Sequence, residues 1–267
     1  MKTKLLIPLA VAVLFGVVSS SHAQTLLDEN FNSMGIAGTT PPTGWTIGFL
    51  GDVGTVNRVV ISPYAGNGLR ITSMPLVVND GSALPALNVG TALNLGTTGS
   101  SDRALGNYPR TNPSGDQIMQ VAVQNNTGGF LSAIGLSYAG EQWRQSQGTS
   151  SSGLETLFVL VSTTSATNGF EALGSAFDFI APLQGPGDIG LDGNAAANRR
   201  VISGTVALPT PVPNGGTFYV RWHDWNDNGT TDHFFGIDDV KIQAVPEPGV
   251  LSLLLLGAAG LIARRRK

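Results

Sequence analysis

The sequence predicts an all-β protein, a two-sheet β-sandwich of the jelly-roll type. About ten to twelve short stretches alternate apolar with polar residues or run continuously apolar, a pattern typical of strands. Glycine, asparagine and proline separate these stretches, with 35 glycines and 15 prolines in 267 residues. Only 12% of the residues are charged and no segment keeps a helical period, so long helices are not expected.

The strand candidates follow one another through a single domain, residues 24–244, with a division into two domains near 100–115 as the alternative. A polar stretch at 100–115 is expected to form a long surface loop, and 184–200 a glycine-rich one. Residues 167–173 are compatible with a short helix. The expected strands are 25–31, 45–49, 56–61, 69–74, 86–95, 119–123, 134–138, 157–161, 201–208, 217–225 and 234–243.

Composition excludes several classes of function. There is no cysteine, so disulfide stabilisation, thiol catalysis and thiolate metal sites are excluded. Six of the 15 lysines and arginines lie in the two terminal segments, which leaves nine basic residues against 18 acidic ones. A body with a net charge of about −9 offers no basic surface for nucleic acid and attracts divalent cations instead.

The first 23 residues are predicted to be a secretory signal peptide. Lys2 and Lys4 supply the charged start, residues 5–18 the apolar region, and Ser21-His22-Ala23 a small-x-small cleavage site. Cleavage there makes Gln24 the first residue of the mature protein. An uncleaved N-terminal anchor is the alternative.

Residues 245–267 form a separate C-terminal segment. Pro246 and Pro248 cannot continue a strand or a helix, so the folded body is expected to end near Ala244. The uncharged stretch 249–263 predicts a short hydrophobic helix. It is shorter than the roughly 20 residues that cross a bilayer comfortably, although a basic end can snorkel and the membrane can thin. The four basic residues that follow mark a cytoplasmic end.

The order of these three parts resembles the PEP-CTERM sorting signal of Gram-negative bacteria. The signature is Pro246, Glu247 and Pro248, and the basic cluster is Arg264, Arg265, Arg266 and Lys267. The resemblance implies that an exosortase, a membrane sorting enzyme, recognises and removes the tail while the protein is transiently anchored in the inner membrane. It also implies delivery to the cell surface or to an extracellular matrix, with exopolysaccharide as a candidate partner.

An oxygen-rich loop near the C-terminus is a candidate calcium site. Asp224, Asn226, Asn228 and Gly229 match positions one, three, five and six of an EF-hand loop, but position twelve is Phe235 where the motif needs glutamate. The loop is therefore not an EF-hand. Two interpretations stay open: a calcium-binding hairpin loop, or an Asx-turn loop whose side chains cap their own backbone.

Asp238 provides a second candidate for calcium. It shares strand parity with Val240 and Ile242, which places it towards the core, and a buried carboxylate needs donors or a cation. In jelly-roll modules that the chain resembles, such an aspartate joins a carboxylate of the first strand around a structural calcium, here Asp28 or Glu29. The alternative is that Asp238 accepts backbone amides.

Two tryptophans are candidates for ligand binding. Trp143, flanked by Glu141 and Arg144, fits a sugar-binding patch in which an aromatic face has polar neighbours. The competing interpretation packs Trp143 in the core and pairs Glu141 with Arg144 or Arg221. Trp225 lies at the edge of the acidic loop and is the better exposed candidate.

Catalysis has little support in the sequence. His223 and His233 flank the acidic loop, yet no Gly-x-Ser-x-Gly elbow and no His-Glu-x-x-His motif occur. We therefore expect a non-enzymatic exported protein with a structural or binding role. A carbohydrate-binding, lectin-like module is the first alternative, and a hydrolase of matrix glycans is the second.

Overall fold

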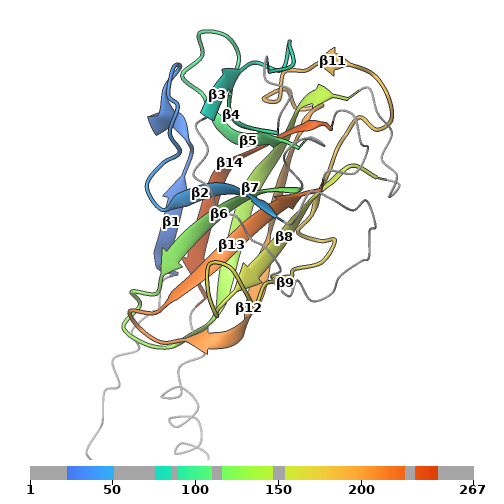
Figure 1. Cartoon of the computed structure of the whole chain (residues 1–267). Helices are drawn as coiled ribbons and strands as arrows, with labels where there is room; N and C mark the ends of the chain where they lie inside the picture. The colour runs from blue at the N-terminus through green and yellow to red at the C-terminus, as the bar shows by residue number, and fades with distance from the viewer. Residues whose placement is uncertain are drawn as a thin grey trace, which may run out of the picture. The chain divides into compact units, whose positions relative to one another are not determined.

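Fourteen strands and one short 3-10 helix, Asn32–Met34, make up the described part of the chain in a computed structural model (Figure 1). The described residues are 23–50, 76–85, 90–109, 116–146, 154–225 and 232–245, and they belong to one unit, Ala23–Val245. The strands form two sheets, which confirms the predicted β-sandwich.

The larger sheet contains eight strands. They are β1 (Thr25–Glu29), β3 (Leu76–Asn79), β4 (Thr91–Leu95), β5 (Ala104–Tyr108), β7 (Leu131–Gln145), β11 (Ile189–Gly190), β12 (Arg199–Val212) and β14 (Phe234–Ala244). Their order is β11-β7-β14-β5-β4-β3, with β1 on β14 and β12 on β7. The β3–β4 pair is parallel, whereas the other described pairs of this sheet are antiparallel.

The smaller sheet contains six strands. They are β2 (Trp45–Leu50), β6 (Asp116–Gln124), β8 (Thr156–Ser162), β9 (Glu171–Ala172), β10 (Phe179–Ile180) and β13 (Thr217–Asp224). Their order is β10-β8-β13-β6-β2, with β9 paired to β8. Strand β13 is therefore central, and its last residue, Asp224, lies opposite Gln117 of β6 and Leu157 of β8.

The main core fills the space between the sheets. Alternate residues of the long strands face it, because side chains of a strand point to opposite faces in turn. At its centre the indole of Trp222 stacks on Trp45 at 5.6 Å and meets the ring of Tyr138 edge-on at 5.5 Å. Inward residues of β13, β6 and β7 show the pattern: Phe218, Val220 and Trp222; Met119, Val121 and Val123; Ile134, Leu136 and Tyr138.

A second, smaller apolar cluster lies on the larger sheet. It consists of Leu93, Leu95, Ala104, Tyr108, Trp143 and Phe234, all buried. These side chains come from β4, β5, the end of β7 and the start of β14. The larger sheet is therefore covered on two faces in this region, and loops cover the second face.

The two ends of the body meet on neighbouring strands. Strand β1 pairs with the C-terminal half of β14, and the amide of Ala244 donates to the carbonyl of Gln24 at 2.8 Å. The amide of Val245 donates to the carbonyl of Ala133 at 3.2 Å. The ordered ladder thus continues up to the residue before Pro246.

Two local predictions were wrong. The expected loop at 100–115 contains β5, all five residues of which are buried. The polar composition of this stretch does not indicate a strand. Glycine is needed at position 106 because a Cβ there would lie only 2.2 Å from Leu95 Cδ1 of β4. The helix expected at 167–173 is instead a turn followed by β9. The strand candidates 56–61 and 69–74, the signal peptide up to residue 22 and the tail from Pro246 lie outside the described residues.

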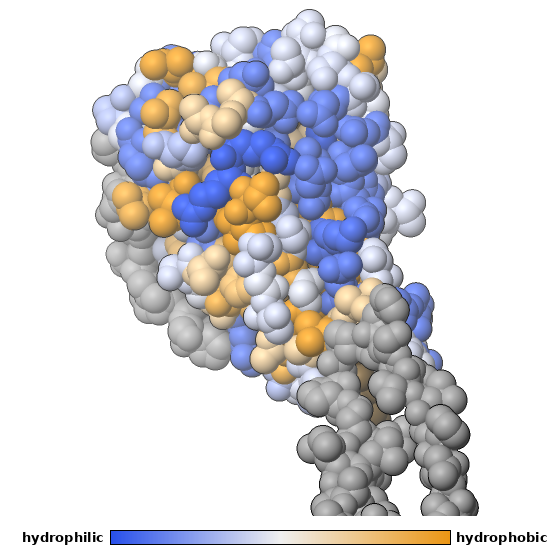
Figure 2. All heavy atoms as spheres, turned by 180° about the vertical axis from the view of Figure 1, so that it is seen from behind, coloured by the Kyte–Doolittle hydropathy of each residue, from blue (hydrophilic) through white to orange (hydrophobic). Residues whose placement is uncertain are grey.

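The surface is mixed in character. On the face that Figure 2 shows, apolar side chains lie in several groups between hydrophilic ones. Large exposed apolar side chains among the described residues come from separate segments, such as Phe130 in the β6–β7 turn and Val201 on β12. Single exposed apolar residues of this kind are ordinary on a solvated protein.

Candidate functional site

The carboxylates proposed for a first-strand calcium site have different partners in the structure. Asp28 forms an exposed ion pair with Lys241, at 3.1 Å between Oδ2 and Nζ. Glu29 accepts a hydrogen bond from the amide of Phe31 at 2.8 Å, which shapes the turn after β1. Both contacts are local to the edge that β1 forms with β14.

Asp238 is buried, with 4% of its surface exposed, but not for the predicted reason. Ile237, Val240 and Ile242 all join the main core because the register shifts after Asp238, so Asp238 does not share their face. The register of β14 against β7 shifts just after it, and Asp239 takes a φ of 49°. Asp238 Oδ1 accepts the amide of Asp239 at 2.7 Å, which matches the alternative of a backbone-bonded carboxylate. Burial, then the nearby charge of Glu141, raises the pKa of Asp238 to about 8. At neutral pH the group is therefore mostly protonated.

Trp143 lies in the second apolar cluster, and only 1% of its surface is exposed. Its indole N–H donates to Glu141 Oε2 at 2.9 Å, and Arg199 holds the other oxygen at 3.1 Å. Burial raises the pKa of Glu141, while these two donors lower it. The arginine partner is thus Arg199 instead of the predicted Arg144 or Arg221, and the indole face of Trp143 is enclosed by protein.

Trp225 follows β13 and is half-buried. Its ring packs against Phe158 at 4.6 Å, and its indole N–H donates to Nδ1 of His223 at 3.2 Å. Because that nitrogen accepts, the proton of a neutral His223 is on Nε2, which lies 3.0 Å from Asp116 Oδ2. Trp143 lies in β7 of the larger sheet, whereas Trp225 directly follows β13 of the smaller one.

Asp224 stands in a group of acidic residues where several strands begin or end. Strand pairing brings it beside Asp116 at the start of β6 and Glu155 just before β8. Asp232 precedes β14 and is buried, as are Glu155 and Asp224. Burial, together with the charges of Asp232, Glu155 and Asp116, raises the pKa of Asp224 well above its usual range. Asn226 and Asn228, the other predicted ligands, lie outside the described residues.

His233 adjoins this group and is fully buried. Its Nε2 lies 2.9 Å from the carbonyl oxygen of Leu183, which only accepts, so Nε2 carries the proton. Burial lowers the pKa of His233, which favours the neutral ring. Its Nδ1 then presents a lone pair, 3.9 Å from Glu155 Oε1. We call Asp116, Glu155, Asp224, Asp232 and His233 the carboxylate–histidine cluster.

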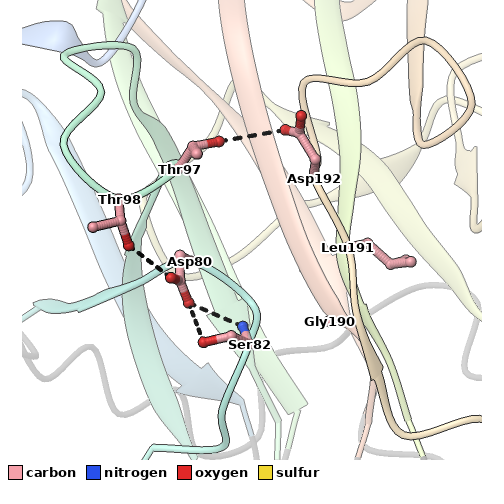
Figure 3. A pocket seen from close by; sticks show the side chains of 7 residues that line it. All are labelled: Asp80, Ser82, Thr97, Thr98, Gly190, Leu191 and Asp192. Atoms are coloured by element: carbon pink, nitrogen blue, oxygen red, sulfur yellow. Dashed lines mark hydrogen bonds between the residues drawn. The ribbon is translucent and has the colours of Figure 1, made fainter.

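A polar hollow of about 490 Å³ lies at the turns after β3 and β4 and beside β11 (Figure 3). Hydrogen bonds from Ser82, then Thr98, lower the pKa of Asp80 to about 2. Across the hollow Thr97 reaches Asp192 at 3.5 Å. The lining residues are Asp80, Ser82, Thr97, Thr98, Gly190, Leu191 and Asp192.

Arg144 forms hydrogen bonds to the segments on both sides of this hollow. Its guanidinium donates to the carbonyl of Gly81 at 2.8 Å and of Ser82 at 3.1 Å, and it also bonds Asp188 ahead of β11. Trp143 adds a second support, because its carbonyl accepts the amide of Leu191 at 2.8 Å. The hollow is thus preformed, and its carboxylates and hydroxyls suit a ligand that donates hydrogen bonds. Among the described residues, no group of three or more His, Cys, Asp or Glu side chains stands ready to hold a metal ion.

The C-terminal segment matches a known family model. Residues 244–267 match the PEP-CTERM protein-sorting motif. The chain carries a PEP-CTERM sorting motif. The resemblance inferred from Pro246, Glu247, Pro248 and the basic end is thereby confirmed, and the motif makes this an exported protein that is sorted to the cell envelope.

The PEP-CTERM chain is similar to several solved structures at low identity. The K3 cleaved adhesin domain of Lys-gingipain from Porphyromonas gingivalis W83 is 15% identical with a TM-score of 0.40, covering 82% of this chain and 99% of that one. The CBM22-1 xylan-binding domain of Xyn10C from Paenibacillus barcinonensis is 11% identical with a TM-score of 0.37, covering 86% and 99%. No curated protein matches the chain. None of the helical structure in the described residues is long and apolar enough to cross a membrane.

Proposed function

We propose that this PEP-CTERM protein is a non-catalytic β-sandwich component of the cell surface or extracellular matrix of a Gram-negative bacterium, released from the inner membrane by an exosortase-type enzyme. The sorting motif itself makes it an exported and sorted protein. Its role after delivery is structural or binding, and matrix exopolysaccharide is the partner we propose.

The observation that carries this proposal is the position of the motif relative to the fold. The match begins at Ala244, the last residue of β14, whose amide closes the ladder with Gln24. The described hydrogen bonds of the body end at Val245, one residue before the Pro-Glu-Pro signature. Removal of the tail at the signature therefore costs the sandwich none of these bonds, as a sorting signal requires.

The test is the C-terminus of the protein recovered outside the cell. In a host with the sorting enzyme, mass spectrometry of the released protein is expected to show a start at Gln24 and an end close to 245–248. Substitution of the signature, Pro246→Ala with Pro248→Ala, is expected to leave the protein in the membrane fraction. Lys241→Ala, which changes a basic residue upstream of the motif, is the control and should be released normally. Released protein that keeps Arg266 and Lys267 would contradict the proposal.

Saccharide binding is a second candidate function, and the polar hollow favours it. Carboxylate oxygens of Asp80 and Asp192 accept hydrogen bonds from sugar hydroxyls, and Thr97 and Thr98 both donate and accept. None of the seven lining residues is aromatic, so binding rests on hydrogen bonds and on the preformed shape. The two aspartates also disfavour anionic glycans through like-charge repulsion, which points to neutral sugars.

A glycan array followed by titration calorimetry on the purified full chain tests this second function. We expect saturable binding of a neutral glycan that weakens at least about tenfold, roughly 1.4 kcal/mol, in Asp192→Asn. Asp28→Asn, which removes an exposed carboxylate paired with Lys241, is the matched control and should bind like the wild type. Equal binding by both variants, or preference for acidic glycans, would place the ligand elsewhere.

A further inference from the structure

Two turns that are bonded to each other form one end of the sandwich. They join β6 to β7 (residues 125–130) and β12 to β13 (residues 213–216), and we call them the terminal face. Asn125 is fully buried between them, and its side-chain amide donates to the carbonyls of Gly129 and Val212, both at 2.8 Å. Its backbone makes two further hydrogen bonds with the second turn, at 2.6 and 2.8 Å. The terminal face is therefore a preformed surface.

Both ends of the described body lie beside this face (Figure 1). The side chain of Gln24 donates to Asn126 Oδ1 at 2.9 Å, and the amide of Val245 donates to the carbonyl of Ala133 near the start of β7. Only the Pro-Glu-Pro signature separates Val245 from the uncharged stretch 249–263. Three residues span at most about 11 Å. A membrane that holds this stretch is therefore within reach of the terminal face.

The terminal face carries no charged residue. Along β1 and β14, the first charged residues from this end are Asp28 and Lys241, which pair with each other at 3.1 Å. The carboxylate–histidine cluster lies at the far end of the same sandwich, since β6 begins at Asp116 and β13 ends at Asp224. Nine residues of β6 separate the two ends by roughly 26 Å, well beyond the Debye length of about 8 Å. The acidic body thus has an uncharged end where its chain leaves, and anionic lipid headgroups do not repel that end.

Phe130 is the last residue of the β6–β7 turn, and 68% of its surface is exposed. A single exposed ring of this kind is ordinary on a free protein. Beside an anchored tail, however, contact with the membrane becomes intramolecular, and a short tether supplies an effective concentration in the millimolar range. An apolar ring on an uncharged turn then enters the boundary between headgroups and acyl chains, as the apolar side chains of interfacial segments do.

We propose that the terminal face lies on the lipid surface while the tail is anchored, with the ring of Phe130 inserted at the headgroup boundary. This inference rests on the proposed function, because it needs the tail in the membrane before the exosortase-type enzyme removes it. The contact holds the Pro-Glu-Pro signature close to the headgroups, where a membrane enzyme acts. Removal of the tail also removes the tether, so one ring no longer retains the body at the membrane.

A single fluorescent label tests the contact, because the chain has no cysteine of its own. Gly129→Cys places the label on the terminal face beside an intact Phe130, and a Cβ at position 129 meets no atom within 4 Å. Val201→Cys on β12 and Leu154→Cys just before β8 are the matched controls, at positions 62% and 53% exposed. The full chain is reconstituted by detergent removal into vesicles of phosphatidylethanolamine and phosphatidylglycerol, and flotation separates bound from free protein.

We expect lipids with a nitroxide near the headgroup to quench the label at position 129, and its emission to shift to shorter wavelength. The labels at positions 154 and 201 should stay unquenched. When Phe130→Ser is added to Gly129→Cys, quenching should fall while the protein still floats with the vesicles, since the tail holds it there. Urea unfolding should show the same stability with and without Phe130→Ser, because the ring is largely exposed.

The outcomes distinguish this contact from the sorting function on which it rests. Protein that does not float with the vesicles would contradict the anchored tail, and with it both proposals. Flotation without quenching at position 129, or with equal quenching at positions 129, 154 and 201, would overturn the contact alone. Quenching that is unchanged by Phe130→Ser would remove the ring from the contact. A label at 129 that is shielded only in membranes containing the sorting enzyme would assign the terminal face to a protein partner and would also overturn the proposal.

Discussion

Asp238→Asn should stabilise the protein, and the gain should grow with pH. In the unfolded chain this carboxyl ionises near pH 3.8, whereas the folded protein holds its proton up to a pKa of about 8. Folding therefore takes up a proton between these values, so the free energy of unfolding falls as pH rises through this window. Asparagine has nearly the same shape and still accepts the Asp239 amide through Oδ1, but it does not ionise.

The magnitude follows from the width of the window. Between pH 5 and pH 8 the cost of keeping Asp238 protonated grows over three pH units, each worth about 1.36 kcal/mol. The advantage of the variant over the wild type should therefore increase by up to about 4 kcal/mol between these pH values.

Urea unfolding of wild type and variant at pH 5, 6.5 and 8 measures this difference directly. Other titrating groups are common to both proteins and cancel in the comparison. A difference in the free energy of unfolding that is the same at pH 5 and pH 8 would refute the reasoning. It would mean that water or a cation keeps Asp238 ionised in the folded state.

Two further predictions concern backbone and surface. Gly81→Ala should lower the free energy of unfolding by about 2–3 kcal/mol, because φ is 80° and a Cβ would lie 2.0 Å from the Trp143 carbonyl oxygen. Gly128 has a similar φ of 85° but open space around it, so Gly128→Ala should lower the free energy of unfolding in urea by only about 1 kcal/mol. Equal losses in the two variants would contradict the steric argument. Lys241→Ala should cost less than about 1 kcal/mol in the same assay, since its ion pair with Asp28 is exposed, and a larger loss would show that this pair is more than a surface contact.

The sequence predicted the sandwich because the core strands keep strict alternation. Phe218, Val220 and Trp222 face inward on β13 as their spacing indicates, and all are buried. Parity with Val240 and Ile242 did not hold for Asp238, because the register shift directly after it places Ile237 in the main core instead, and Asp238 is buried on the other face. Alternation is a local property of the chain, so it can be read without knowing the partner strand.

Strand β5 shows what local patterns miss. Gly106 and Asn107 make it resemble a loop, yet both are needed inside, where Gly106 lets β4 approach and Asn107 is fully buried. No rule of strand propensity identifies such a segment, because its stability comes from neighbours on both sides. The prediction of a loop was wrong because contacts with neighbouring strands, and not the composition of the segment, make β5 a strand.

The residues of the candidate sites are brought together by strands that lie far apart in the sequence, so they were even harder to predict. The sequence identified Asp224 through its loop pattern, but Glu155 and His233 joined it only because β13 pairs with β8 and His233 directly precedes β14. The Glu141–Arg199 pair is likewise set by the register of β7 against β12, over 58 residues of separation. A lone glutamate ahead of an apolar run gives no local signal of such a role.

Strand β14 also determines how the body would respond to a pull on its C-terminal end. It runs between β7 on one side and β1 and β5 on the other (Figure 1). The sorting motif begins at its last residue, Ala244. Antiparallel ladder bonds stand perpendicular to the strands, so tension along β14 loads many of them together in shear and does not open them one at a time. The body should therefore withstand a force applied through its C-terminal end far better than it would with a terminal edge strand that could be peeled away.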